Sequence, residues 1–244
     1  MRGVIIAGGI SKRLRPKTCN IPKTLLKLDQ KVILEHILDA AYKAGITHFD
    51  ILTGHGHDYV KGFMKLYQEH YPDTTFDLWF IERYQETGNV IALQAAQHLF
   101  DQEMIIINSD TVFHSDLIKK LLHTPEKNAM LIDDYKKLGA EEMKVMVDND
   151  DQIVRIHKSL DPLTAEGEYV GLLKFSPDSK QQLQDATKDM MQKDESVYYE
   201  DAIQKAIDDY AFKIKKISTD NLPVMEIDTP EDLATAHDLI KKII

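Results

Sequence analysis

The sequence predicts an α/β fold built on a mixed, mostly parallel sheet with helices on both faces. In the first half, short apolar runs alternate with segments of helical periodicity. The run at residues 104–107 is apolar throughout, as expected of a strand that is buried on both faces. In the second half, two short apolar segments flank the residues DNDD at 148–151, whose Asp and Asn side chains favour a hairpin turn.

Each element follows from one of these patterns, and together they give a Rossmann-like order with a small β-hairpin and helical extension. In the first half we expect strands at 4–7, 49–53, 78–81 and 104–107, and helices at 32–44, 58–67 and 90–99. In the second half we expect a hairpin from 144–147 and 152–156, strands at 169–175 and 212–217, and helices at 176–190, at 199–208 and from Pro230 onward. No linker or repeat divides the chain, so residues 1–244 are expected to form a single domain.

Composition excludes several classes of function. The net charge of −10 argues against a nucleic-acid partner, and no apolar run of about 18 residues predicts a membrane span. The single cysteine excludes a disulfide framework, and we expect a cytoplasmic protein. Residues 1–31 nevertheless hold eight of the 30 Lys and Arg residues against one acid, Asp29. This segment predicts either a site for a small anionic ligand or a solvated basic face.

A glycine-containing loop follows the first predicted strand. Residues 8–16 read GGISKRLRP, and Pro22-Lys23 comes shortly afterwards. Gly8 and Gly9 allow backbone N–H groups to approach phosphate oxygens, while Arg13 and Lys23 can offset phosphoryl charge. Two glycines alone would indicate only a tight turn. The P-loop and dinucleotide-binding patterns are both absent from the sequence, which disfavours a P-loop kinase or a dinucleotide-dependent dehydrogenase.

Two aspartates mark a candidate metal site. Asp110 follows the apolar run at 104–107, and Asp228 precedes the closing helix. Ligands of open α/β sheets bind at the carboxyl ends of the strands, and Mg²⁺ favours one or two carboxylates together with phosphate oxygens. For Asp228 alone, a helix cap is the competing interpretation.

These motifs resemble the nucleoside-triphosphate transferase superfamily, which has a GT-A-like fold and includes sugar-1-phosphate nucleotidylyltransferases and bacterial cytidylyltransferases. Ser11 stands where that family more often has glycine. The resemblance implies that Asp110 and Asp228 bind catalytic Mg²⁺, that Lys23 contacts the α-phosphate, and that Arg13 holds the departing pyrophosphate. These four would be the catalytic residues of an enzyme that needs no covalent intermediate.

The resemblance divides the chain into an NTP-binding half, 1–135, and an acceptor-binding half, 136–244, that completes the metal site. The loop at Thr87, Gly88 and Asn89 would hold the base and ribose, although Thr87 or Asn89 could instead cap the following helix. The expected nucleotide-binding residues are Ala7, Gly8, Gly9, Ser11, Arg13, Lys23, Thr87, Gly88 and Asn89.

The second half resembles cytidylyltransferases for phosphocholine and 2-aminoethylphosphonate, which implies CTP as the donor. Lys158 would meet the acceptor's phosphate, acids would surround its cationic end, and Tyr169, Tyr198 and Tyr199 could offer ring faces to an ammonium group. The expected acceptor-binding residues are Lys158, Glu168, Tyr169, Gly171, Glu200, Asp201 and Glu226. Solvated surface acids are the competing interpretation for Glu200 and Asp201.

The predicted function is therefore Mg²⁺-dependent transfer of CMP from CTP to phosphocholine, phosphoethanolamine or 2-aminoethylphosphonate, with release of pyrophosphate. One alternative is a sugar-1-phosphate nucleotidylyltransferase with the same catalytic residues. Another is a nucleotide-binding regulatory module without turnover. A homodimer is expected only because small enzymes often pair.

Overall fold

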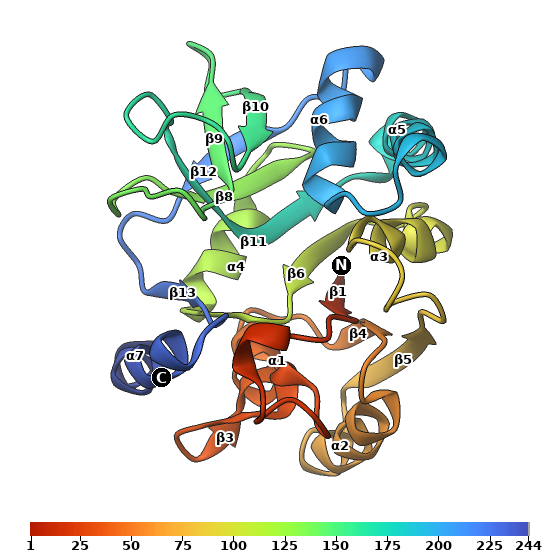
Figure 1. The fold of residues 1–244 in the computed structure, drawn as a ribbon, viewed down its shortest axis with the longest axis vertical. Coiled ribbons are helices and arrows are strands. Elements are labelled where there is room, and N and C mark those ends of the chain that lie inside the picture. Colours follow the sequence, from red (N-terminus) through yellow and green to blue (C-terminus); the bar gives the residue numbers. More distant parts are fainter. Residues whose placement is uncertain (244) are drawn as a thin grey trace.

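A nine-stranded sheet forms the centre of the molecule in this computed structural model, which describes residues 1–243 (Figure 1). Its main path runs β10-β9-β11-β6-β1-β4-β5, with β8 beside β11 and β12 beside β8. The strands are β1 (Arg2–Ala7), β4 (His48–Thr53), β5 (Thr75–Phe80), β6 (Met104–Asn108), β8 (Ala129–Asp133), β9 (Lys144–Val147), β10 (Ile153–His157), β11 (Gly167–Phe175) and β12 (Lys215–Ser218). The strands β6, β1, β4 and β5 are parallel, whereas β11 runs antiparallel to β6, so the sheet is mixed as predicted.

Helices cover both faces of this sheet. They are α1 (Ile33–Lys43), α2 (His57–His70), α3 (Val90–Ala95), α4 (Ser115–His123), α5 (Lys180–Lys193), α6 (Tyr199–Tyr210) and α7 (Pro230–Ile243). In Figure 1, α1, α2 and α7 lie in the lower part of the molecule, and α5 and α6 lie in the upper part. Within residues 1–243, no helix is both long and apolar enough to cross a membrane.

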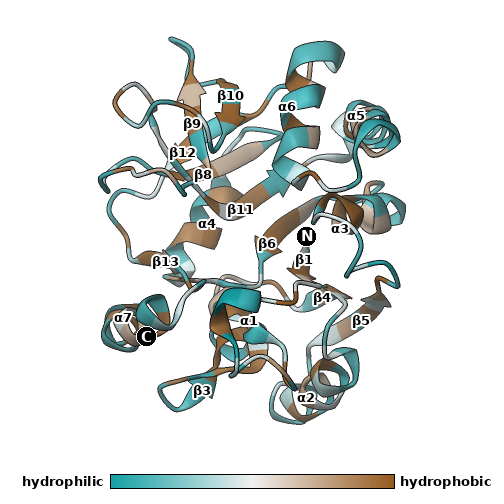
Figure 2. Ribbon diagram, viewed as in Figure 1, coloured by the Kyte–Doolittle hydropathy of each residue, from teal (hydrophilic) through white to brown (hydrophobic). Residues whose placement is uncertain are grey.

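Two hydrophobic cores follow from the alternation of side chains along the strands. Ile5 and Ile105 pack with buried residues of α1, α2, α4 and α7, whereas Val4 and Ile106 pack with those of α3, α5 and α6. Successive side chains of a strand point to opposite faces, so a strand covered on both faces must be apolar at every position. Figure 2 accordingly shows β1 and β6 in hydrophobic colours and much of α5 in hydrophilic ones.

Several elements were missing from the sequence prediction. The strand β8 and the helix α4 were not predicted, and neither were the short pairs β2 (Lys27–Leu28) with β3 (Lys31–Val32) and β7 (Thr111–Phe113) with β13 (Val224–Glu226). Strands of two or three residues are too short to show a period. The predicted helix at 90–99 is α-helical only to Ala95 and continues as a 3₁₀ helix from Ala96 to Leu99.

The pairing of β7 with β13 places two distant carboxylates side by side. These strands run antiparallel with Glu226 opposite Thr111, and Ile227 N donates to Asp110 O at 2.9 Å. Asp228 therefore lies next to Asp110, although 118 positions separate them in the sequence. Strands from both halves of the chain join the central sheet, so the site lies between segments that are remote in sequence.

Candidate active site

The glycine-containing loop begins where β1 ends and is held by its own backbone. Leu14 N donates to Ser11 O at 3.1 Å, and the buried Thr18 hydroxyl donates to the same oxygen at 2.9 Å. Ser11 has φ 52° and ψ 54°, a left-handed conformation that favours glycine. This geometry explains why glycine suits position 11, and serine tolerates it here with two hydrogen bonds on its carbonyl.

Lys23 links the two predicted metal-binding aspartates. Its Nζ donates to Asp110 Oδ2 at 2.9 Å and to Asp228 Oδ1 at 2.8 Å, and its side chain is almost fully buried. Arg13 donates to the other oxygen of Asp228, Oδ2, at 2.7 Å. The four residues predicted to be catalytic are thus brought together in one connected ion-pair network.

The charges of Lys23 and Asp228 favour each other's ionised form. Burial lowers the pKa of Lys23, but the negative charges of Asp110 and Asp228 outweigh it and leave the pKa raised. Burial acts to raise the pKa of Asp228, whereas Lys23 and Arg13 lower it further than burial raises it. The ammonium group of Lys23 therefore stays charged beside the carboxylate of Asp228 at neutral pH.

The donor set at this point suits a magnesium ion. Asp110 Oδ1 is buried, and it has no hydrogen-bond partner among the residues that the structure describes. A buried carboxylate oxygen without a partner is unfavourable, and coordination to a cation would satisfy it. Asp110 and Asp228 together offer the one or two carboxylates that Mg²⁺ takes beside phosphate oxygens. These residues fit the ion that the resemblance implies.

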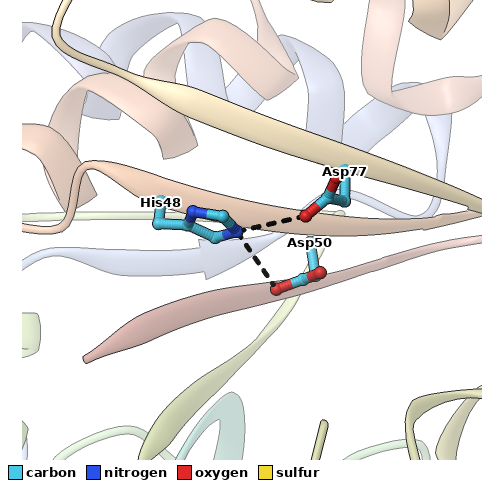
Figure 3. Close-up of side chains that lie close together, drawn as sticks. All are labelled: His48, Asp50 and Asp77. Carbon is cyan, nitrogen blue, oxygen red and sulfur yellow. Dashed lines mark ion pairs between the residues drawn. The ribbon is translucent and has the colours of Figure 1, made fainter. Parts of the chain in front are cut away.

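A second cluster of metal-type ligands lies elsewhere on the sheet. His48, Asp50 and Asp77 come from the adjacent strands β4 and β5 and point toward one another (Figure 3). Arg2 already lies among them, with its Nε 2.6 Å from Asp50 Oδ2 and its NH2 3.3 Å from Asp77 Oδ2. Trp79 Nε1 donates to the second oxygen of Asp50 at 2.9 Å. Because the guanidinium group of Arg2 already contacts both acids, we interpret the cluster as an ion-pair network.

A cavity of about 490 Å³ opens beside the loop. Its lining includes every residue that the sequence predicted to bind the nucleotide, namely Ala7, Gly8, Gly9, Ser11, Arg13, Lys23, Thr87, Gly88 and Asn89. The loop of Thr87 is bound to the segment before α6, since Gly88 N donates a hydrogen bond to Glu195 O at 2.7 Å. A Cβ on Gly88 would lie 2.0 Å from Val197 O, so only glycine allows this close approach.

A second cavity of about 480 Å³ adjoins the first. Arg13, Asn89, Asn108, Asp110, Tyr198 and Asp228 line both, so the ion-pair network lies where the cavities meet. The second lining also contains Lys158, Glu168, Glu200 and Glu226, four of the residues predicted to bind an acceptor.

Three other predicted acceptor residues do not line this cavity. Tyr169 is fully buried, and its hydroxyl pairs at 2.9 Å with that of the equally buried Tyr199. Gly171 adopts φ 76°, and a Cβ there would lie 2.7 Å from Asn108 Cβ, so its place is structural. Asp201 accepts a hydrogen bond from Tyr198 N at 2.8 Å and caps α6. The structure gives Tyr169, Tyr199 and Gly171 packing contacts and Asp201 a capping contact, so their predicted contact with the acceptor stays a prediction that this arrangement disfavours.

Burial raises the pKa of three carboxylates in the second cavity. Burial raises the pKa of Glu200 to about 7, with a further contribution from the charge of Asp201. Burial also raises the pKa of Glu168, although Lys136 Nζ lies 2.8 Å from its Oε2. The pKa of Glu226 is raised by burial and by the charge of Asp110. Crowded acids of this kind favour a cationic ligand.

The sequence did not reveal several lining residues. Asn108 ends β6, and its Oδ1 accepts a hydrogen bond from the Tyr199 hydroxyl at 2.9 Å. This bond joins β6 to α6. Lys136 belongs to the segment between β8 and β9, and no motif marks it. Asn108 could have been found from its place directly before Ser109-Asp110 at the end of an apolar strand.

Comparison with known proteins identifies the class of this enzyme. A family model described as nucleotidyl transferase matches residues 2–158, more than half of the chain, and the chain belongs to this family. It is a nucleotidyltransferase. One relative is the CTP:phosphoglutamine cytidylyltransferase of Campylobacter jejuni, 26% identical over 192 residues that cover 72% of this chain and 73% of the relative.

Other similar proteins differ in the nucleotide named. A D-glycero-alpha-D-manno-heptose 1-phosphate guanylyltransferase of Aneurinibacillus thermoaerophilus is 29% identical over 119 residues, 49% of this chain and 50% of that protein. The solved structure of CTP:phosphocholine cytidylyltransferase from Streptococcus pneumoniae has a TM-score of 0.76 and 17% identity, covering 98% of both chains. At that identity the likeness shows a shared fold.

Proposed function

We propose that this enzyme transfers CMP from CTP to a small amino-phosphate or amino-phosphonate and releases pyrophosphate, with Mg²⁺ as its metal. The observation that carries the proposal is the position of the Lys23-Asp110-Asp228 network between a cavity with a phosphate loop and a cavity rich in acids. Residues 1–135 would supply most of the nucleotide site, and residues 136–244 most of the acceptor site.

The residues of the network have distinct tasks in this reaction. Lys23 would contact the α-phosphate, and Arg13 would hold the pyrophosphate as it departs, so both offset charge that develops during transfer. Asp110 and Asp228 would hold Mg²⁺, which supplies neutralisation of phosphate charge. The acceptor is already an anion near neutral pH, so the protein needs to align its oxygen with the α-phosphorus and needs no strong base.

Charge distribution supports a zwitterionic acceptor. Lys158 lines the second cavity and would meet the phosphate or phosphonate, while Glu200 and Glu226 would face the amine. A hexose carries no cation to balance these buried acids. The donor CTP is supported by the similarity to the Campylobacter CTP:phosphoglutamine cytidylyltransferase.

Pyrophosphate release tests the proposal. The purified enzyme with Mg²⁺ would be assayed with each of the four NTPs against phosphoethanolamine, 2-aminoethylphosphonate, phosphocholine, glucose 1-phosphate and a control without acceptor. Selective release with CTP and an amine-bearing acceptor is the expected result. Release only with the sugar phosphate would support the sugar nucleotidylyltransferase alternative, which the heptose 1-phosphate guanylyltransferase relative makes a concrete competitor.

A regulatory module that binds nucleotide without turnover gives a different outcome. Such a protein would bind CTP in a calorimetric titration yet release no pyrophosphate with any of the four NTPs and any acceptor. The intact Lys23, Asp110 and Asp228 network favours the enzyme, because binding alone does not require all three side chains.

A further inference from the structure

Glu200 is a lining residue of the second cavity, and its carboxylate is buried. Only 5% of the residue is exposed, and its Oε2 has no hydrogen-bond partner within the described part of the chain. A buried acceptor atom without a donor costs free energy, which a ligand carrying an N–H group would recover. This oxygen therefore identifies what kind of group the cavity is built to receive.

Several acids of the second cavity have a cation within 4 Å, whereas no ion pair that short involves Glu200 in the described part of the chain. Lys136 Nζ lies 2.8 Å from Glu168 Oε2 and 3.5 Å from Glu142 Oε1. Lys23 and Arg13 similarly neutralise Asp228. Two carboxylate oxygens in the described lining are buried and without a donor: Asp110 Oδ1, which is expected to face the metal ion, and Glu200 Oε2.

Aromatic faces are scarce in the same cavity. Tyr198 is the one aromatic residue in its described lining, and Lys158 Nζ already lies 4.9 Å from the centroid of that ring. Tyr169 and Tyr199 turn their hydroxyls to each other inside the core. A quaternary ammonium has no N–H to donate and is recognised mainly by aromatic faces, which this cavity does not assemble.

We infer that the cationic end of the acceptor is an ammonium group with N–H donors, bound through Glu200 Oε2, and that a trimethylammonium acceptor is discriminated against. The inference rests on the proposed function and narrows its acceptor class to primary amines. Glu200 is the specificity-determining residue: it selects the acceptor by supplying the hydrogen-bond acceptor that methylation leaves unmatched.

A methylation series tests this on the unaltered enzyme. kcat/KM would be measured with CTP and phosphoethanolamine, then with its N-methyl, N,N-dimethyl and N,N,N-trimethyl forms, the last being phosphocholine. One to two hydrogen bonds to a charged group correspond to a loss of about tenfold to a hundredfold between the first and last members. Equal or greater kcat/KM for phosphocholine overturns the inference while leaving cytidylyl transfer to an amino-phosphate in place.

A matched pair of variants assigns the effect to Glu200. In Glu200→Gln, kcat/KM for phosphoethanolamine should fall about tenfold or more, while that for phosphocholine changes less, so the selectivity narrows. Glu69→Gln makes the same chemical change on the exposed surface of α2 and should alter neither value. Unchanged selectivity in Glu200→Gln, in protein with a normal thermal transition, overturns the assignment.

Failure of the underlying function has its own result. If none of the four methylation states releases pyrophosphate with any NTP while glucose 1-phosphate does, the proposed function is wrong and the inference falls with it. The methylation series needs no variant, so it tests the preference for an ammonium group with N–H donors even if Glu200→Gln does not fold.

Discussion

The ammonium group of Lys23 lies 2.9 Å from Asp110 Oδ2, whereas the second oxygen of that carboxylate, Oδ1, is buried with no hydrogen-bond partner among residues 1–243. One oxygen is thus committed to a lysine expected to contact phosphate, and the other is left for a cation. The Asp110 side chain would therefore contact both the metal ion and the lysine that is expected to bind the nucleotide. The first predictions concern this pair.

Replacing Asp110 or Asp228 with asparagine should lower kcat/KM by at least about a hundredfold, because each change removes a carboxylate from the metal site and a partner of Lys23. Steady-state pyrophosphate release measures this. Asp101→Asn, on the surface near α5, is the control and should behave as wild type. Wild-type turnover in Asp110→Asn would refute its proposed role.

Removal of divalent cations should abolish pyrophosphate release, and added Mg²⁺ should restore it. The reason is that Lys23 and Arg13 are already paired with Asp110 and Asp228, so without a metal ion they leave much of the charge of an NTP unneutralised. A titration with a chelator followed by Mg²⁺ gives the measurement. Undiminished activity in excess chelator would show that the fit of Asp110 and Asp228 to a metal ion has no part in turnover.

Gly9→Ala separates ligand binding from folding. A Cβ on Gly9 would meet no described atom within 4 Å, so the free energy of unfolding should change little. Gly9 lines the first cavity, however. The added methyl group should keep phosphate away from the backbone and so raise KM for the NTP about tenfold. Thermal unfolding and NTP-dependent kinetics measure the two effects. An unchanged KM would place the phosphates elsewhere.

Acceptor use should depend on the ionisation of Glu200. The pKa of Glu200 in the free enzyme is about 7, and the charged form is the one that attracts an ammonium group, so kcat/KM for phosphoethanolamine should fall about tenfold from pH 8 to pH 6. The acceptor's own phosphate protonates near pH 6, so Glu200→Gln serves as the control and should keep only that part of the profile. Identical profiles for both enzymes would contradict the prediction.

The free energy of unfolding should decrease as the Glu200 carboxyl ionises, whereas acceptor use should increase. Because burial raises the pKa of Glu200 from 4.5 to about 7, the folded state binds more protons than the unfolded state between these values. Stability therefore falls as the pH rises through this window, by about 3 kcal/mol at most. Glu200→Gln should raise Tm by about 5 °C at pH 8 and by little at pH 5. A larger gain at pH 5 would reverse the sign and refute the argument.

Local pattern and strand geometry explain which parts of the site could be predicted. The loop after β1 and Asp110 after β6 follow strands of unmistakable apolar character, and the carboxyl ends of parallel strands share one edge of a sheet. Asp228 was recognisable from its position before a helix that begins at Pro230. The proximity of Asp110 to Asp228 itself depends on the short β7-β13 pairing, which has no period to detect.

The residues proposed to bind the acceptor were harder to predict, because some charged and aromatic residues of this region line the cavity while others pack in the core or cap a helix. Tyr198 and Tyr199 are adjacent in sequence, yet the first is 47% exposed in the cavity and the second is buried. Which face of α6 points inward depends on Asn108 and Tyr169, whose positions are set by other strands. Sequence alone could not separate Glu200, which lines the cavity, from Asp201, which caps the helix.

The loop of Gly88 and Asn89 is bound to the segment that begins α6. Gly88 N donates to Glu195 O at 2.7 Å, and Asn89 Oδ1 accepts from Tyr199 N at 2.7 Å. The loop proposed to hold the base and ribose is thus joined by these two hydrogen bonds to the helix proposed to carry acceptor-binding residues. Exchange of the proposed acceptor half between relatives would therefore require residues 195–199 to be transferred together with residues 87–90. A chimera joined only at the midpoint of the chain would separate these two contacting segments.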